Sequence, residues 1–370
     1  MASDTKTWLI LHLLFLIACY MQHCVNGESS QVPCLFIFGD SFSDSGNNNY
    51  IPTIAKANYP PYGIDYPDGP TGRVTNGETQ VDIIGNLLGF EKPIPPFENI
   101  NGSDIRKGVN YASSSAGIRN ETGKQTMRTN IDLGQQIENH KSIVAQIASK
   151  TIGVISPLEY LKKCLYFVYI GTNDYALNYF QPQFYPTSST YRPEQYAQVL
   201  SNQLSDYVED LYDLGARKFV AVGLGKIGCT PMALNNTITD FKRSKCVERL
   251  NDIEAMYSHR LRSLVNQFNT KHQDSKAIFV NTTAIGLDSS LESSVLGFTN
   301  FNQSCCPTMS DGFCVRDSTP CANRDEYIYY DGIHPTSAVN NITASLAYDS
   351  TDHPEITSPM DIKHLAQLVI

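Results

Sequence analysis

The sequence predicts an α/β fold in which a parallel sheet is covered by helices on both faces. Four short apolar runs, rich in β-branched and aromatic residues, have the length of buried strands: residues 35–38, 165–170, 218–222 and 277–280. Longer segments with apolar residues at helical spacing lie between them. Strands that alternate with helices along most of a chain favour a parallel sheet with helices on either side.

The composition agrees with a soluble protein that has a sizeable core. Of the 370 residues, 41% are hydrophobic and 18% are charged. The formal net charge of −9 and the lack of a Lys/Arg block argue against a nucleic-acid partner. No linker or repeat divides residues 28–370, so we expect a single domain there.

The first 27 residues have the pattern of a signal peptide. Lys6 precedes an apolar stretch over residues 8–21, and residues 25–27 offer a cleavage site. The stretch is too short to span a membrane, and no other long apolar run follows. We therefore expect a secreted, extracellular protein without an integral membrane span.

The cysteines and the glycosylation sequons agree with an oxidising compartment. Among the eight cysteines that follow the predicted signal peptide, Cys34 and Cys164 lie in apolar runs and are interpreted as buried thiols. Cys229 and Cys246 are a candidate local disulfide. Scattered histidines and the lack of a C-x-x-C pair argue against a zinc site. Six N-x-S/T sequons predict glycans on surface loops: Asn101, Asn120, Asn235, Asn281, Asn302 and Asn341.

The elements of the first half follow one another with clear boundaries. The first strand stops at Gly39, and a Pro/Gly/Tyr-rich surface loop follows at residues 59–70. The aromatic residues of that loop either line a substrate cleft or cover the core. Apolar residues at helical spacing predict helices over residues 79–88 and 131–149. Between them, a short strand is expected at 108–112.

The second half continues the alternation. Residues 192–214 form a predicted helix with Pro193 at its start, and residues 245–269 form another. A cysteine-rich loop at 304–323 precedes a last helix over residues 337–347.

Residues Gly223 to Gly228 match G-x-G-x-x-G directly after a strand, a pattern typical of dinucleotide binding. In that use the motif opens a helix, whereas Cys229, Thr230 and Pro231 follow here. We interpret these glycines as turn formers and expect no organic cofactor.

Four polar side chains stand at strand ends or before a helix: Ser41, Asn173, Asp331 and His334. A serine hydroxyl becomes a nucleophile when a general base takes its proton, a role that suits His334 with Asp331 as its orienting partner. Asn173 and backbone N–H groups near Ser41 and Ser115 would supply donors to an oxyanion. Taken singly, each motif also fits an ordinary turn or helix cap.

Four blocks in this order resemble those of the plant GDSL esterase/lipases, members of the SGNH hydrolase superfamily. They are Gly39-Asp40-Ser41-Phe42, residues 108–117, Gly171-Thr172-Asn173-Asp174 and Asp331-Gly332-Ile333-His334-Pro335. The resemblance extends over residues 34–347. It implies a three-layer α/β/α sandwich with a flavodoxin-like parallel sheet.

The resemblance also assigns roles to the residues of these blocks. It implies that Ser41 is the nucleophile, His334 the base and Asp331 its partner. The oxyanion hole would use the backbone N–H groups of Ser41 and Ser115 and the side chain of Asn173. The family's glycine pair is Ser114-Ser115 here, so the hole requires a backbone conformation at Ser115 that a residue with a Cβ can adopt.

These roles predict hydrolysis of a small-molecule lipid, sugar or phenolic ester through an acyl-Ser41 intermediate. The reaction requires no metal and no cofactor. An alcohol in place of water would make the protein an acyltransferase. The third hypothesis is a binding protein on the same scaffold, with catalysis weakened by the Ser114-Ser115 change.

Overall fold

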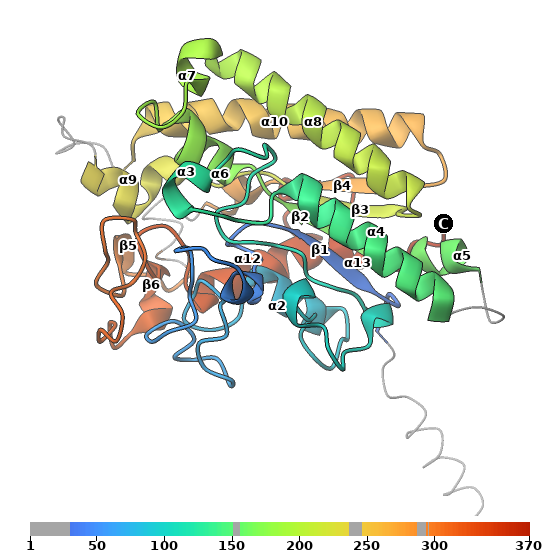
Figure 1. The fold of residues 1–370 in the computed structure, drawn as a ribbon, viewed down its shortest axis with the longest axis horizontal. Helices are drawn as coiled ribbons and strands as arrows, with labels where there is room; N and C mark the ends of the chain where they lie inside the picture. Colours follow the sequence, from blue (N-terminus) through green and yellow to red (C-terminus); the bar gives the residue numbers. More distant parts are fainter. Residues whose placement is uncertain (1–29, 151–155, 237–245, 287–293, 295) are drawn as a thin grey trace, which may run out of the picture.

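The computed structural model describes residues 30–150, 156–236, 246–286, 294 and 296–370. Their central feature is a five-stranded sheet in the order β1-β2-β3-β4-β7. Figure 1 shows this sheet between two layers of helices, the predicted α/β/α sandwich. The strands are β1 (Leu35–Gly39), β2 (Leu165–Tyr169), β3 (Lys218–Val222), β4 (Lys276–Val280) and β7 (Thr357–Ser358). The predicted signal peptide lies outside the described residues.

The four predicted strands pair in parallel, and nearly all their residues are buried. Their apolar side chains fill both faces of the sheet, as expected for strands covered on two sides. The central sheet is thus mostly parallel, as predicted, and only the edge strand β7 was not expected from the sequence. β7 adds an antiparallel edge in which Thr357 pairs with Val280, and two residues are too few to leave a periodic signal.

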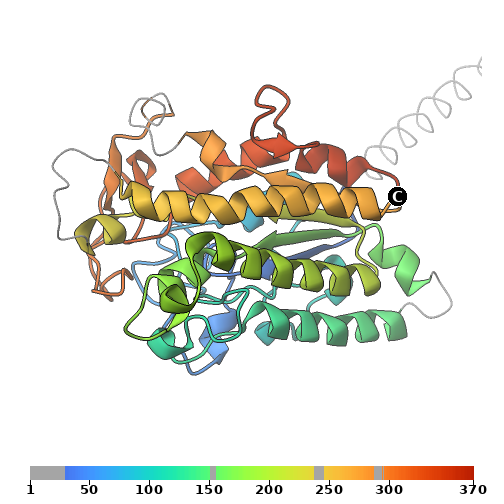
Figure 2. The same ribbon diagram turned by 90° about the horizontal axis from the view of Figure 1, so that it is seen from above.

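Long helices cover both faces of the sheet. The helices α4 (Leu133–Lys150), α8 (Pro193–Asp213) and α10 (Glu248–Lys271) lie side by side over one face (Figure 2). The opposite face carries α2 (Gln80–Leu87), α12 (Ser337–Tyr348) and α13 (Ile362–Gln367). A capping box between Thr79 and Asp82 fixes the start of α2.

Shorter elements complete the described chain. The short helices are α3 (Lys124–Met127), α5 (Pro157–Leu161), α6 (Thr172–Asp174), α7 (Thr187–Thr190) and α9 (Pro231–Asn236). The 3-10 turns are η1 (Asn47–Tyr50), η2 (Phe97–Asn99), η3 (Ile105–Lys107), η5 (Ile227–Cys229), η6 (Thr282–Ile285) and η7 (Arg324–Glu326), and η4 (Tyr175–Tyr179) is a π-helical turn. Strands β5 (Asn300–Ser304) and β6 (Tyr327–Tyr329) form a separate two-stranded sheet.

The segment at residues 108–112 lies along β1 but does not form the predicted strand. Its Tyr111 N–H donates to the carbonyl of Ile37 at 2.8 Å, and Val109 accepts from the Ile37 N–H at 3.1 Å. Only Asn110 makes bridges, one of them to Ile37. Gly108 allows this approach, since a Cβ there would lie 1.9 Å from the Leu35 carbonyl oxygen.

Disulfides join all eight of the cysteines that follow residue 29: Cys34–Cys164, Cys229–Cys246, Cys305–Cys321 and Cys306–Cys314. The pairing of Cys229 with Cys246 confirms the prediction. Cys34 and Cys164 are buried as expected, but they form a disulfide, so their interpretation as thiols was wrong. Because Leu35 pairs with Leu165 across β1 and β2, the two preceding cysteines are neighbours, with Cα atoms 4.7 Å apart.

The tyrosines of the loop at residues 59–70 are buried, which decides between the two alternatives for that loop. Tyr59, Tyr62 and Tyr66 pack inside, and the first two belong to an apolar cluster with the Cys306–Cys314 disulfide. They cover a core and do not line the cavity beside Ser41.

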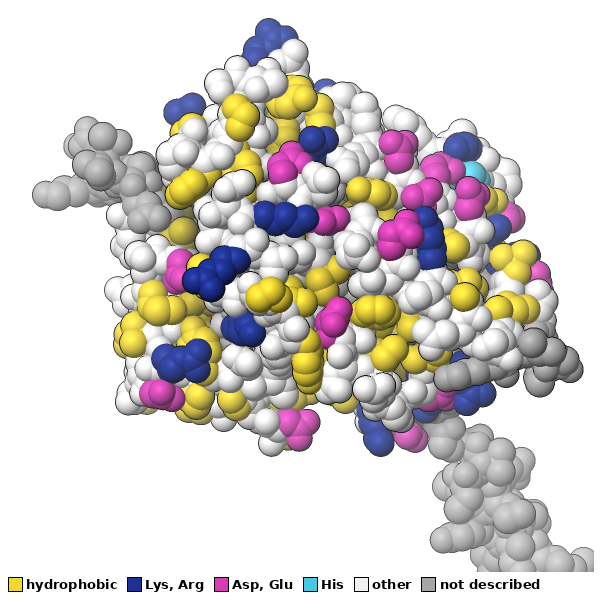
Figure 3. Space-filling view, in the orientation of Figure 1, with side chains coloured by type: hydrophobic (Ala, Val, Ile, Leu, Met, Phe, Trp, Pro, Cys, Tyr) yellow, Lys and Arg dark blue, Asp and Glu magenta, His cyan; other side chains and the backbone are white. Residues whose placement is uncertain are grey.

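The sequon asparagines lie at the surface, but not all of them in loops. Five are exposed, and Asn281 is half-buried. Asn235, Asn302 and Asn341 lie on α9, β5 and α12, so the expectation of loops was wrong for these three. On the face drawn in Figure 3, acidic and basic side chains are interspersed with apolar ones. Within the described ranges, no helix is long and apolar enough to cross a bilayer.

Candidate active site

The loop after β1 brings Ser41 to the carboxyl edge of the sheet. Gly39 ends the strand against β2, where a Cβ would lie 2.7 Å from the Tyr169 carbonyl oxygen. The side chain of Gln136, on α4, accepts from the Gly39 N–H at 2.9 Å and donates to its carbonyl at 2.8 Å. The Asp40 carboxylate accepts from the Phe42 N–H at 3.1 Å. These bonds fix the backbone on both sides of Ser41.

Ser41, His334 and Asp331 form a continuous hydrogen-bonded chain. The Nε2 atom of His334 lies 2.8 Å from the Oγ atom of Ser41. On the other side of the ring, Nδ1 lies 2.9 Å from Oδ2 and 3.0 Å from Oδ1 of Asp331. Asp331 is fully buried, and His334 is 3% exposed. The contact between Nδ1 and the carboxylate directs the Nε2 lone pair at the serine hydroxyl.

The local backbone gives Asp331 its orientation. Its Oδ1 atom accepts from the N–H groups of Ile333 at 2.8 Å and His334 at 2.7 Å. The carboxylate and the imidazole therefore come from one tight turn before α12. Asp331 does not cap that helix, because Thr336 is the N-cap and accepts from the Val339 N–H.

Three potential oxyanion donors, Ser41, Ser115 and Asn173, line the same cavity. The Asn173 amide donates one hydrogen to the Ala116 carbonyl at 2.9 Å, which orients the amide and leaves its second hydrogen. Within the described part of the chain, no acceptor binds the backbone N–H of Ser41 or of Ser115. All three groups therefore have a hydrogen to offer a ligand.

Ser115 adopts the left-handed backbone conformation that a glycine would favour, with φ of 68°. The side chain of Asn130 donates to its carbonyl at 2.9 Å and to the Thr122 carbonyl at 2.9 Å. A serine thus occupies the glycine position and keeps its N–H. The backbone conformation is one that a residue with a Cβ adopts at a modest cost in free energy.

Two buried carboxylates, Asp40 and Asp174, belong to the segments that carry Ser41 and Asn173, and neither is hydrogen-bonded to Ser41. Burial raises the pKa of Asp40 to about 7, although its bond from the Phe42 N–H acts in the opposite direction. Burial likewise raises the pKa of Asp174 to about 6. The Asp174 carboxylate accepts from the Ile118 N–H at 2.7 Å and the Thr122 hydroxyl at 2.7 Å. It ties the segment after Ser115 to α6, which carries Asn173.

A cavity of about 250 Å³ opens beside the Ser41 hydroxyl. Its lining is mainly apolar and includes Met127, Ala176, Leu177, Phe180, Leu250 and Phe313. A neighbouring cavity of about 140 Å³ lies behind Phe42 and shares five lining residues with the first: Phe42, Thr172, Ile227, Thr230 and Ile333. A cavity whose lining is mainly apolar suits a small, mostly apolar ligand.

The sequence motifs predicted the side chains that meet at this site. They did not predict Gln136 and Asn130, whose hydrogen bonds fix the backbone around the site. Gln136 and Asn130 carry no motif, since each acts through backbone contacts that exist only in the folded chain. Among the described residues, no group of three or more His, Cys, Asp or Glu side chains is arranged to hold a metal ion.

A parallel α/β sheet whose carboxyl edge presents a hydrogen-bonded serine, histidine and aspartate has the architecture of the α/β serine hydrolases. A sequence profile of the family described as GDSL-like Lipase/Acylhydrolase matches residues 35–347. The chain belongs to this family, which confirms the resemblance, and it is therefore a carboxylic ester hydrolase.

Similar proteins cover nearly the whole chain. The GDSL esterase/lipase At1g29660 of Arabidopsis thaliana is 45% identical over 341 residues, which are 91% of this chain and 92% of the relative. The GDSL esterase/lipase At1g29670 of the same plant is 40% identical over 372 residues, covering 100% of both chains. The GDSL esterase/lipase At4g18970, also from Arabidopsis thaliana, is 41% identical and covers 91% of this chain and 93% of its own.

Proposed function

We propose that this protein is a secreted serine hydrolase that cleaves carboxylic esters through an acyl-Ser41 intermediate. The observation that carries the proposal is the unbroken contact from Ser41 Oγ to His334 Nε2, at 2.8 Å, and from Nδ1 to Asp331, at 2.9 Å. This spacing is within reach of direct proton transfer from the hydroxyl to the imidazole.

The first half-reaction acylates Ser41. Its Oγ atom attacks the ester carbonyl carbon while His334 Nε2 takes the hydroxyl proton. Asp331 stabilises the imidazolium that forms. When the tetrahedral intermediate collapses, the bond to the alcohol oxygen breaks and His334 returns the proton to the departing alcohol.

The second half-reaction releases the acid. A water molecule gives its proton to His334 and attacks the acyl carbon, and the Ser41 oxygen then leaves and recovers a proton. In both halves the negative oxygen lies among the N–H groups of Ser41, Ser115 and Asn173, whose prior orientation lowers the barrier. An alcohol acceptor in place of water would give acyl transfer.

The substrate that fits best is a small ester with an apolar acyl group. The cavity wall formed by Leu177, Phe180 and Leu250 offers burial to a hydrocarbon chain and few partners to a polar one. The relatives carry the name esterase/lipase, which agrees with an acyl ester. We propose a lipid or phenolic ester ahead of a sugar ester.

A fluorophosphonate probe, which phosphonylates activated serines, tests the proposal. We expect the folded wild-type protein to be labelled and the Ser41→Ala variant to remain unlabelled. The same pair assayed on p-nitrophenyl esters of graded acyl length should hydrolyse them only when Ser41 is present. Wild-type protein that is folded but unlabelled would instead favour a binding protein on this scaffold.

The proposal of secretion rests on the signal-like residues 1–27, the four disulfides and the surface sequons. Residues 28–370 would form the mature, single-domain protein. Expression in a eukaryotic secretory host should yield a glycoprotein in the medium that begins near residue 28. Five of the six sequon asparagines are exposed. Peptide-N-glycosidase treatment should lower the mass of the protein and convert each glycosylated asparagine to aspartate.

A further inference from the structure

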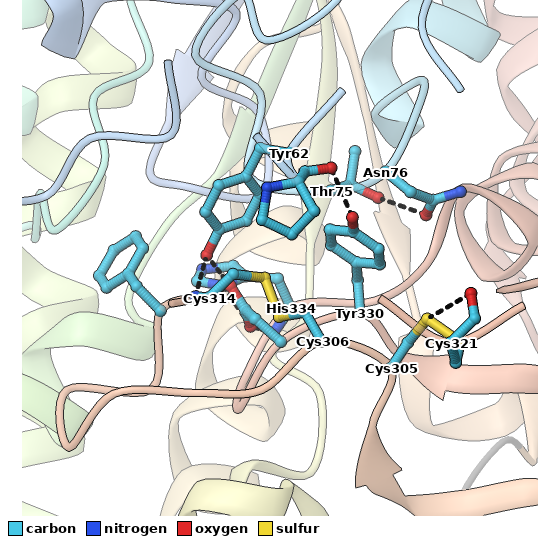
Figure 4. Close-up of a disulfide and its surroundings, with 12 residues drawn as sticks. Tyr62, Thr75, Asn76, Cys305, Cys306, Cys314, Cys321, Tyr330 and His334 are labelled. Carbon is cyan, nitrogen blue, oxygen red and sulfur yellow. Dashed lines mark hydrogen bonds and ion pairs between the residues drawn. A yellow bond between two sulfur atoms is a disulfide. The ribbon is translucent and has the colours of Figure 1, made fainter. Parts of the chain in front are cut away.

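We propose that Tyr62 is a positioning residue for the catalytic acid–base pair, acting through Asp331. This inference rests on the proposed function, because it assigns Tyr62 a role in the Ser41–His334–Asp331 chain. Tyr62 lies in the Pro/Gly/Tyr-rich loop, 269 positions from Asp331 in sequence, and its hydroxyl is 2.7 Å from Asp331 Oδ2. Figure 4 shows the hydroxyl pointing towards Cys314 and His334.

The direction of this hydrogen bond is fixed by a second one. The backbone N–H of Cys314 donates to the Tyr62 hydroxyl oxygen at 3.0 Å. That oxygen is thereby occupied as an acceptor, so the hydroxyl hydrogen is free to point only at the carboxylate. Burial raises the pKa of Tyr62 well above its ordinary value, and the phenol therefore remains a donor throughout the working range.

Asp331 has a specific need for this donor. Its Oδ1 atom receives two backbone N–H groups, whereas Oδ2 has only His334 Nδ1 and Tyr62 as partners among the described residues. The carboxylate is fully buried, so bulk water does not replace a lost donor. Tyr62 thus completes the set of hydrogen bonds that sets the plane of the carboxylate and its charge.

Disulfide-bonded surroundings hold the tyrosine in place. Cys314 is joined to Cys306, and the Tyr62 ring packs edge-on against Tyr59, Phe313 and Tyr330, with centroids 5.4–6.4 Å apart. The Tyr330 hydroxyl donates to the Pro61 carbonyl at 2.5 Å, beside Tyr62 in the chain. The hydroxyl of Tyr62 is therefore presented on a rigid aromatic cluster.

A donor to Oδ2 spreads the negative charge of Asp331 and moderates its attraction for the imidazolium. Loss of the hydroxyl should strengthen the hold of His334 on its proton and loosen the carboxylate. Asp40, Tyr59 and Tyr330 are the other titratable groups near this pair, but none of them hydrogen-bonds to it. Tyr59 and Tyr330 donate to the carbonyls of Cys314 and Pro61, and Asp40 accepts from the Phe42 N–H.

The test compares Tyr62→Phe with Tyr59→Phe. Tyr59 is a matched control, since its buried hydroxyl donates to the carbonyl of the same Cys314 at 3.0 Å but does not reach Asp331. We expect Tyr62→Phe to move the acidic limb of the kcat/KM–pH profile upward by roughly half a unit to one unit and to lower kcat/KM roughly three- to tenfold at pH 6. Tyr59→Phe should leave the limb in place, even if both variants unfold at a lower temperature.

A second replacement removes any dependence on how well the Phe variant folds. 3-Fluorotyrosine at position 62 keeps the ring and the contact but is a more acidic donor, so the limb should move in the opposite direction. The role of Tyr62 is overturned if neither replacement at position 62 moves the acidic limb of the pH profile. It is also overturned if Tyr59→Phe and Tyr62→Phe move that limb equally. Activity that survives Ser41→Ala would instead overturn the proposed function, and the two failures are therefore distinguishable.

Discussion

Asp44 Oδ2 accepts both the backbone N–H of Ser114, at 2.9 Å, and its hydroxyl, at 3.0 Å. This pair joins the loop that carries Ser41 to the turn that carries Ser115. Asn48 adds a bond to the Ser114 carbonyl at 2.9 Å. The left-handed conformation of Ser115 is thus imposed from both sides, by these contacts and by the bond from Asn130 to its carbonyl.

The first prediction concerns Ser115, where the chain has a Cβ at a glycine-like backbone angle. Ser115→Gly removes a cost of roughly 1–2 kcal/mol, partly offset by the greater freedom of glycine in the unfolded chain. We expect Ser115→Gly to unfold at an equal or higher urea concentration than Ser115→Ala and to keep its esterase activity. A glycine variant less stable than the alanine variant would contradict a conformational cost at this position.

The second prediction concerns the Asn173 amide, which has one hydrogen free for an oxyanion. Asn173→Ala should lower kcat by roughly 10²–10³-fold with little change in KM, since the bond forms mainly in the transition state. Gln181→Ala is the control, because this amide lines the same cavity and donates to the Ala176 carbonyl. Equal losses in the two variants would argue against a specific oxyanion donor.

The third prediction distinguishes the two cavities. Ala176→Phe fills part of the cavity beside Ser41, so kcat/KM should fall for octanoyl esters by at least roughly tenfold more than for acetyl esters. Thr343→Phe projects into the neighbouring cavity behind Phe42 and should leave that ratio unchanged. The ratio of the two rates is the measurement, since it cancels any general loss of folded protein.

The fourth prediction is a pH dependence of stability from Asp40. Because burial raises its folded pKa to about 7 from 3.8, the folded chain retains a proton that the unfolded chain has lost. Stability therefore falls as the pH rises through this window and levels off above about pH 7. Asp40→Asn should be more stable than wild type at pH 8, by up to about 4 kcal/mol, and show no such gain at pH 4.

Urea denaturation of both proteins at several pH values measures this difference. Asparagine retains an acceptor for the Phe42 N–H, so the loop keeps its bond. A stability difference that stays constant between pH 4 and pH 8 would show that Asp40 does not retain the proton.

Much of the sandwich could be predicted because its strands are strong apolar runs. β1 to β4 and the helices α2, α4, α8, α10 and α12 agree with the predicted ranges to within a few residues. The segment at 108–112 resembles a strand in composition, but only Asn110 makes bridges. The two residues of β7 owe their place to β4, a tertiary contact without a local signal.

The candidate active site was likewise predictable only where its residues stand in local sequence motifs. Ser41, Asp331 and His334 stand in motifs, so the sequence identified them, and the structure brings them into contact; their catalytic roles stay predictions. Tyr62 stands in a loop whose aromatic residues, judged from the sequence, either line a substrate cleft or cover the core. Its contact with Asp331 depends on chain closure across 269 positions, which no local pattern encodes.

The distance of 293 positions between Ser41 and His334 has a consequence for biosynthesis. A ribosome finishes the β1 strand early, but the base and its carboxylate leave the exit tunnel only when most of the chain has been made. During nearly all of its synthesis, a nascent chain therefore carries Ser41 without the histidine that we propose as its base. Under the proposed mechanism, ester hydrolysis can begin only when the chain is almost complete.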